Sequence, residues 1–269
     1  MKAVRIHASE DHPRLEDVAP PDVLGDGEVL VRIYDAGVNP FDFVPSATPR
    51  TLGRDFAGQV MEIGDAVSDF ARGDRVFGFA NGSYAEFAAI PANACARMPK
   101  SADFDEAAAL PTPALTAYQL MMHEVQVCEG QTVLIQGMIS IVGSLAAQLA
   151  EWQEAQVVTQ RARQVDAVID LTGDAELARS YPLVREGGII VTLGGRLDEA
   201  ELAQRGIRGV QFAMQPNGAQ LNIVARLVDA GVLQPRLGRV LPLAEAKLAW
   251  ELVHAQGSRS KIVLSVSHP

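Results

Sequence analysis

The stretch from Val133 to Ala150 constrains the fold of this chain more than any other segment. It combines a short apolar run typical of a buried strand, a glycine-containing turn and a segment with helical periodicity. The same alternation continues along the chain, with strand or helix patterns at Val133–Gln136, Ser144–Trp152, Ala167–Leu171, Leu177–Leu183 and Ile189–Leu193. Strands that alternate with helices predict a parallel sheet covered by helices.

The turn after the first of these strands resembles a dinucleotide-binding turn in part. Such a turn needs glycine where the backbone approaches a diphosphate and where the helix packs on the strand. Gly137 and Gly143 occupy the first and last of these places, but Ser140, Ile141 and Val142 lie between them. A β-branched side chain at Ile141 is expected to crowd the diphosphate. The sequence therefore predicts a nicotinamide-enzyme turn whose cofactor site is altered.

The first 97 residues follow a different pattern. Short β-like runs separated by Gly, Pro and Asp predict a compact, mostly antiparallel β domain, with strands at Glu28–Ile33, Ala57–Ile63, Arg75–Phe79 and Tyr84–Ile90. Helices are then expected at Phe104–Leu110 and Leu115–Met122, with Pro111 and Pro113 marking the break between them. The chain ends with a predicted strand at Lys261–Val266.

Charge and composition exclude several classes of partner. The formal net charge of −10 argues against nucleic acid and anionic membranes, which attract basic surfaces. Hydrophobic residues make up 48% of the chain, as in ordinary globular proteins, and no apolar run is long enough to cross a bilayer. Cys95 and Cys128 offer no disulfide framework, so we expect a cytoplasmic protein whose partner is a small-molecule substrate.

Several motifs carry a likeness that covers nearly the whole chain in the correct order. They are Ala36-Gly37-Val38-Asn39-Pro40-Phe41-Asp42, Leu52-Gly53-Arg54-Asp55-Phe56-Ala57-Gly58, Gly73-Asp74-Arg75-Val76-Phe77-Gly78, Gly82-Ser83-Tyr84-Ala85-Glu86, Glu106-Ala107-Ala108-Ala109-Leu110-Pro111 and Leu115-Thr116-Ala117-Tyr118. With the ending 257–266, these motifs resemble the medium-chain dehydrogenase/reductase superfamily, in particular its zinc-independent quinone oxidoreductase-like branch.

The resemblance implies a fold of class α/β plus β. A GroES-like β domain, residues 1–97 and 235–269, would carry catalysis, and a truncated Rossmann-type parallel-sheet domain, residues 98–234, would bind the cofactor. Relatives of this kind bind NADPH between the domains, reduce quinones or α,β-unsaturated carbonyls, and commonly form homodimers. A homodimer is therefore expected. A bound zinc ion is not expected, because Asn39 and Gly53-Arg54-Asp55 replace the Cys and Gly-His-Glu motifs of the zinc enzymes. The five histidines are scattered and offer no cluster of ligands.

The chain departs from the family after its second Rossmann-type strand. Ala155–Thr159 and Val165–Leu171 resemble the second and fourth strands, and only Gln160–Gln164 lies between them. A complete half would place a helix, a third strand and another helix there. Val157–Thr159 is therefore either a shortened edge strand or part of a loop beneath a sheet without strand three.

The missing segment bears on the cofactor. The residues from Val157 to Gln164 include no acid to bind an adenosine ribose, which disfavours NAD, whereas Arg161 and Arg163 offer charges for a 2′-phosphate or are solvated loop arginines. These residues are compatible both with a protein that binds NADPH and with one that has lost this cofactor.

Each candidate site residue also has a structural interpretation. Asn39 and Asp42 match family positions that face the nicotinamide, or else form an Asn-Pro turn capped by the aspartate. Arg54 lines the same cleft or makes a structural ion pair, and Tyr84 is either a core residue or an acid. In the cofactor domain the candidates are Gly194 and Gly195 at a strand end, which a plain turn also explains, and Phe212, which either covers the nicotinamide or packs in the contact between the domains.

Three functions compete on this basis. The first is an NADPH-dependent reductase of quinones or enones. The second is a cofactor-independent derivative that guides a redox-neutral reaction such as conjugate addition or cyclisation. It is motivated by Ile141 and the absent segment. The third is a binding protein without catalysis, against which the polar pair Asn39 and Asp42 argues. The reductase is the preferred prediction.

Overall fold

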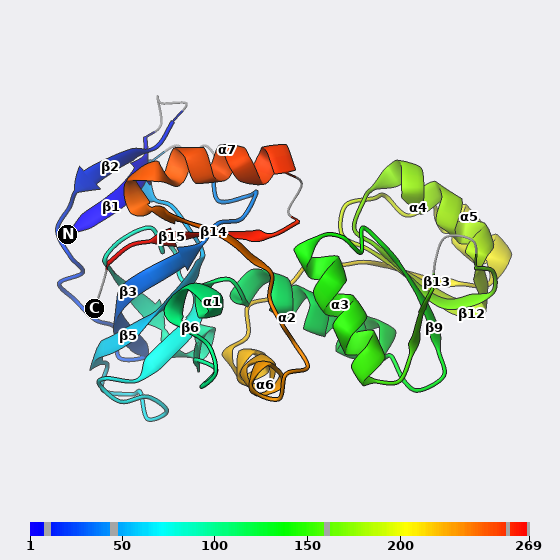
Figure 1. Ribbon diagram of the computed structural model, residues 1–269, viewed down its shortest axis with the longest axis horizontal. Helices are drawn as coiled ribbons and strands as arrows, with labels where there is room; N and C mark the ends of the chain where they lie inside the picture. Colours follow the sequence, from blue (N-terminus) through cyan, green and yellow to red (C-terminus); the bar gives the residue numbers. More distant parts are fainter. Residues whose placement is uncertain (8–11, 44–47, 159–161, 257–258, 268–269) are drawn as a thin grey trace. The chain divides into compact units, whose positions relative to one another are not determined.

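The computed structural model describes residues 1–7, 12–43, 48–158, 162–256 and 259–267 (Figure 1). It contains two compact units, the first formed by Met1–Thr112 with Pro216–Pro269 and the second by Pro113–Gln215. The sequence placed the boundaries after residues 97 and 234, so the first unit extends further in both directions than expected.

The first unit is built around a sheet with strand order β14-β15-β3-β5-β6-β8, in which β7 also pairs with β3. All pairings in this sheet are antiparallel except that of β14 with β15. The strands are β3 (Glu28–Gly37), β5 (Asp55–Ile63), β6 (Arg75–Phe79), β7 (Phe87–Pro91), β8 (Cys95–Arg97), β14 (Leu237–Pro242) and β15 (Lys261–Ser265). A smaller sheet has the order β2-β1-β4, with β1 (Lys2–Ile6), β2 (Arg14–Asp17) and β4 (Arg50–Thr51). The predicted antiparallel β domain is confirmed.

Two helices explain why the first unit reaches beyond the predicted boundaries, α1 (Phe104–Ala108) and α6 (Gly218–Asp229). The unit also contains α7 (Ala246–Gln256) and the 3₁₀ turns η1 (Ala92–Ala94) and η4 (Leu243–Glu245). A Cβ at Gly218 would lie 2.3 Å from the carbonyl oxygen of Cys95, so only glycine lets α6 begin against this backbone. Asp229, at the other end of α6, accepts hydrogen bonds from the amide and hydroxyl of Ser101. Both ends of α6 are thereby held to the β domain.

The second unit contains a parallel sheet with the order β10-β9-β11-β12-β13. Its strands are β9 (Thr132–Gln136), β10 (Gln156–Val158), β11 (Val165–Asp170), β12 (Val184–Thr192) and β13 (Arg208–Gln211). This order is that of a Rossmann sheet whose outermost third strand is absent from the described residues. Of the two alternatives for the segment near Val157, the short edge strand is confirmed for β10, and Thr159 lies outside the described residues.

Helices complete the second unit: α2 (Pro111–Gln119, whose first two residues belong to the first unit), η2 (Leu120–Val125), α3 (Ile141–Trp152), α4 (Asp174–Ser180), η3 (Tyr181–Leu183) and α5 (Glu199–Arg205). The predicted break near Pro111 is correct in place, but Pro111 begins α2 because proline suits the first helical position. Starting from the central strands, α3 leads toward β10 and α4 leads toward β12. Right-handed crossovers in opposite directions place these helices on opposite faces of the sheet (Figure 1).

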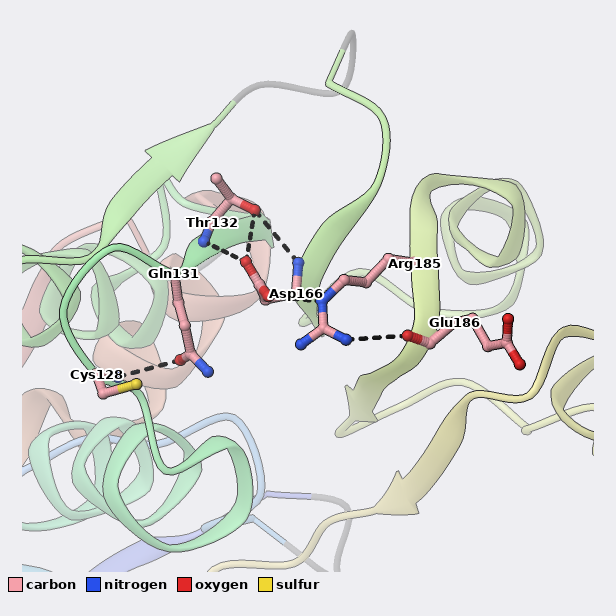
Figure 2. Close-up of polar contacts among 6 residues, drawn as sticks. All are labelled: Cys128, Gln131, Thr132, Asp166, Arg185 and Glu186. Atoms are coloured by element: carbon pink, nitrogen blue, oxygen red, sulfur yellow. Dashed lines mark hydrogen bonds and ion pairs between the residues drawn. The ribbon is translucent and has the colours of Figure 1, made fainter.

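The amino-terminal ends of three parallel strands are tied together by Asp166 (Figure 2). Its carboxylate accepts from the amide of Thr132 at 2.7 Å and from the Nε of Arg185 at 2.7 Å. Burial opposes ionisation of this carboxyl, but the hydrogen bonds from Thr132 and Arg185 outweigh it and lower its pKa. Asp166 therefore fixes the register of β9, β11 and β12 at the sheet edge where these strands begin.

Candidate functional site

The turn that follows β3 is organised by Asp42. Its Oδ2 accepts from the amide of Asn39 at 2.8 Å and from the hydroxyl of Tyr84 at 2.7 Å. Asn39, Asp42 and Tyr84 are all buried. The structure thus brings together three of the four predicted catalytic residues, and the turn-capping interpretation of Asp42 is confirmed.

A buried ion pair lies next to this turn. Lys261 Nζ donates to Asp55 Oδ2 at 2.9 Å and to Asn39 Oδ1 at 2.6 Å, and both charged side chains are almost completely buried. The hydroxyl of Thr112 donates to the other oxygen of Asp55. Gly37 makes room for the pair, since a Cβ at this position would lie 2.8 Å from Cε of Lys261. No sequence motif had pointed to Lys261 beyond its place in the last predicted strand.

The contact with Lys261 orients the Asn39 amide. An ammonium can only donate, so the asparagine oxygen must face it and the Nδ2 group must point elsewhere. This Nδ2 is buried and has no hydrogen-bond partner among the described residues. A buried donor left unpaired costs about 1–3 kcal/mol, so it is a group that a ligand carbonyl would satisfy.

Burial controls the ionisation of this cluster. It raises the pKa of Asp42 to about 6, although the hydrogen bond from Tyr84 acts in the opposite direction. Burial also raises the pKa of the Tyr84 hydroxyl well above its usual value, and the charge of Asp42 adds to this effect. Tyr84 is fully buried, and its hydroxyl donates its hydrogen bond to Asp42. Its geometry therefore favours a positioning role over the predicted role as an acid.

The fourth predicted catalytic residue, Arg54, lines a pocket of about 680 Å³ in the first unit. Its guanidinium carbon lies 5.9 Å from the ring centre of Phe41 and 5.6 Å from that of Phe79. Arg50 and Asp42 line the same pocket. The site therefore joins aromatic surface with positive charge, and sequence reasoning had not placed Arg50 or Phe79 in it.

In the second unit the turn between β9 and α3 has the backbone expected of a nucleotide turn. Gly137 has a φ of +81°, which favours glycine. A Cβ at Gly143 would lie 2.4 Å from the carbonyl oxygen of Gly137, so α3 packs closely on the turn only with glycine there. Ser140 is the N-cap of α3, and its hydroxyl accepts from the amide of Gly143 at 3.1 Å. The first helical amides, those of Ile141 and Val142, have no partner within a helix.

The prediction that the side chain of Ile141 would crowd a bound diphosphate is wrong. Ile141 is the first residue of α3 and only 6% exposed, so it packs within the protein. The exposed apolar side chains of the turn are Met138, at 47%, and Ile139, at 60%. Any apolar crowding of a diphosphate would therefore come from these two residues.

Replacing Gly143 by alanine is expected to lower the unfolding free energy of the second unit by about 1–3 kcal/mol, the usual effect of overpacking. The new Cβ would meet main-chain atoms of Gly137 and Met138, which cannot rotate away. Urea unfolding followed through Trp152, in a Trp250→Phe background, reports on this unit because Trp152 ends α3. Gly194→Ala is the matched control, since its Cβ would meet open space and leave stability unchanged.

The carboxyl ends of the parallel strands gather polar groups, as ligand sites of open α/β sheets do. Buried Asp170 accepts from the hydroxyls of Thr172 and Thr192. The hydroxyl of Thr192 accepts from the amide of Gly195, and its carbonyl oxygen accepts from the amide of Phe212. The predicted residues Gly195 and Phe212 are thereby brought together, with Gly194 beside them.

Gln136, at the end of β9, was not among the predicted site residues. Its Nε2 donates to the carbonyl oxygen of Glu176, which leaves its buried Oε1 without a partner among the described residues. A polar residue ending an apolar strand was the signal in the sequence. Arg161, the predicted partner of a 2′-phosphate, lies outside the described residues.

The described residues hold no group of three or more His, Cys, Asp or Glu side chains placed to bind a metal ion. Within the described ranges, no helix is long and apolar enough to cross a bilayer.

Comparison with known proteins identifies the family. The model of the alcohol dehydrogenase GroES-like domain matches residues 25–100, and that of the zinc-binding dehydrogenase family matches residues 146–264. Quinone oxidoreductase from Sus scrofa is 29% identical over 302 aligned positions, which cover 92% of each chain. Since 302 positions exceed the 269 residues of this chain, the relative carries segments that this chain lacks.

Solved structures agree in fold. Quinone oxidoreductase from Coxiella burnetii superposes with a TM-score of 0.88 at 27% identity, covering 99% of both chains. A mycobacterial protein complexed with NADPH gives a TM-score of 0.88 at 23% identity, covering 98% of this chain and 100% of the other. Both the GroES-like domain and the Rossmann-like parallel sheet are therefore confirmed, and this chain belongs to the medium-chain dehydrogenase/reductase superfamily of oxidoreductases, with quinone oxidoreductases among its relatives.

Proposed function

We propose that this protein is an NADPH-dependent reductase of quinones or α,β-unsaturated carbonyl compounds. The observation that carries the proposal is the turn between β9 and α3. There Gly137 and Gly143 allow the close backbone approach that a diphosphate requires, and the amino terminus of a twelve-residue helix offers its amides. The quinone oxidoreductase relatives support the same reading.

The residues present fit this cofactor. The amides of Ile141 and Val142 would bind the diphosphate. The Oε1 of Gln136, which no described residue contacts by a hydrogen bond, is an acceptor at the strand end where nucleotides bind. Open space beside Gly194 leaves its backbone accessible. Described residues Gln156–Val158 provide no carboxylate for a ribose hydroxyl, which favours NADPH over NADH.

The side chains of the first unit would serve the reacting carbonyl. NADPH supplies a hydride when bound. The Nδ2 of Asn39 would donate to a carbonyl oxygen, held in place through Lys261 on its other side. Because the ion pair and the Tyr84–Asp42 hydrogen bond are buried, the amide is oriented before a ligand arrives.

The test is calorimetric titration with NADPH together with charge reversal in the turn. We expect wild-type protein to bind NADPH more tightly than NADH, and Ser140→Asp to weaken NADPH binding at least about tenfold through repulsion of the diphosphate. Aspartate is as good an N-cap as serine, so the helix is retained. Ser140→Asn is the neutral control and should bind nearly as wild type.

A second function is favoured by Met138 and Ile139, whose exposed apolar side chains flank the turn. If wild-type protein does not bind NADPH at millimolar concentration, the reductase proposal fails, and a redox-neutral reaction guided by the same pocket becomes the better explanation. Equal binding by Ser140→Asp and wild type would instead show that the diphosphate does not lie at α3.

A further inference from the structure

The pocket of the first unit holds a guanidinium in a fixed position. The main chain of Arg54 is anchored because its carbonyl oxygen accepts from the amide of Ala80 at 2.8 Å. The preceding residue, Gly53, accepts from the amide of Gly82 at 3.0 Å. The side chain of Arg54 then contacts the rings of Phe41 and Phe79. A half-buried arginine held by two aromatic rings loses little further freedom when it binds a ligand.

The charge of Arg54 is not neutralised by the part of the chain that the structure describes. No carboxylate of the described residues lies within ion-pair distance of it, whereas the buried carboxylate of Asp55 is paired with Lys261. The acidic residue that lines the pocket, Asp42, uses its Oδ2 to bind Tyr84 and the amide of Asn39. Arg50 also lines the pocket and donates to the carbonyl oxygen of Asp42 at 3.4 Å. In a chain with a net charge of −10, the pocket thus contains the positive charge of Arg54.

The chemistry of the lining indicates the ligand. Phe41 is 46% exposed, so its ring offers apolar surface for a planar conjugated molecule. A guanidinium that contacts aromatic rings still presents N–H groups at its edge, and these match the two oxygens of a carboxylate. The pocket volume of about 680 Å³ accommodates a molecule with one or two rings.

We propose that this pocket selects conjugated carbonyl substrates that carry a carboxylate, and that Arg54 binds this carboxylate. The inference deepens the proposed reductase function. It rests on that function only for the statement that the substrate has a reacting carbonyl group. Arg54 is then a specificity-determining residue, and Phe41 and Phe79 form the aromatic wall of the same site.

The experiment compares two probes that differ in one charge: 4-carboxybenzylideneacetone and its methyl ester. Calorimetry on the wild-type protein is expected to show the carboxylate binding about ten- to a hundredfold more tightly, the range for hydrogen bonds to a charged group. Arg54→Gln should abolish this preference and change the affinity for the ester by less than about twofold. Arg54→Lys should keep part of it, because the charge remains but the planar fork is lost.

Arg97→Gln is the matched control. Arg97 also lies over an aromatic ring, that of Phe70 at 5.6 Å, but it does not line this pocket. This variant changes the net charge equally and should keep the wild-type preference. The proposal is overturned if wild-type protein binds both probes equally, if Arg54→Gln keeps the preference, or if Arg97→Gln loses it as well.

Failure of the two proposals can be told apart. Binding of the probes is measured without NADPH, so a carboxylate preference without NADPH-dependent turnover would contradict the reductase proposal alone. Turnover of both probes with equal kcat/KM would contradict the role of Arg54 alone.

Discussion

Replacing Lys261 by methionine is expected to lower the unfolding free energy of the first unit by about 3–5 kcal/mol, because it leaves the buried carboxylate of Asp55 without its cation. Methionine retains most of the length of the lysine side chain, so loss of packing contributes little. Urea unfolding followed by the fluorescence of Trp250 measures the effect, since Trp250 lies in α7 of this unit. A Trp152→Phe background removes the signal of the second unit.

The double variant Asp55→Asn with Lys261→Met is the control that isolates the charge. It removes both ions, and the asparagine oxygen still accepts from the hydroxyl of Thr112. Replacing a complete buried pair by neutral groups is often close to neutral in stability, so more than half of the loss should be recovered. Equal losses in the single and double variants would show that packing, not an unpaired charge, destabilises the protein.

The same variant bears on the site. In wild-type protein the ammonium of Lys261 holds the oxygen of Asn39, and the asparagine Nδ2 is thereby directed away from it. Without the ammonium both orientations of the amide become accessible, and the donor proposed to meet a ligand carbonyl is no longer fixed. The lysine of the stabilising ion pair is thus the same group that orients the candidate donor.

The fold was predictable because its signals are local. The alternation of strand and helix patterns identified the parallel sheet, and the five residues between Thr159 and Val165 were too few for the missing strand and its helices. The end of the sheet was not foreseen. The strand β13 (Arg208–Gln211) has only one strongly apolar residue and lies at an edge, so it lacks the pattern that identifies buried strands.

The candidate site was predictable only in part because its contacts are distant in sequence. Asn39 and Asp42 form one turn, and both were identified from a local motif. Lys261 lies 206 positions from Asp55 and was not identified, since only strand pairing with β3 brings the two together. Ile141 was misjudged for another reason: the direction of a side chain at a helix start depends on the backbone of the turn, which composition does not reveal.

The stability of wild-type protein is expected to fall by about 2 kcal/mol between pH 4 and pH 7 relative to an Asp42→Asn variant. Burial raises the pKa of Asp42 from 3.8 to about 6 in the folded protein. The folded chain therefore holds this proton more tightly than the unfolded chain. The stabilisation is present in full below about pH 4, declines as the pH rises through 6, and is lost above about pH 7.

Asparagine is a suitable neutral replacement because both hydrogen bonds of the turn converge on one oxygen. The amide of Asn39 and the hydroxyl of Tyr84 each donate to Oδ2 of Asp42, and a single asparagine oxygen has two lone pairs to accept them. The nearby charges of Asp55 and Lys261 are unchanged in the variant. Asp35, whose pKa is raised to about 7 by burial and by Asp105, titrates in the same range but contributes equally to both proteins.

The measurement is urea unfolding of the two proteins at several values between pH 4 and pH 7, with Trp250 as the probe. The difference in unfolding free energy should move in favour of Asp42→Asn as the pH rises, with its midpoint near pH 5, between the unfolded and folded pKa values of Asp42. A difference that is constant with pH would mean that Asp42 is ionised throughout the range. The Tyr84 hydrogen bond, not burial, would then dominate its ionisation, and the turn would hold a permanent negative charge beside the pocket that contains Arg54.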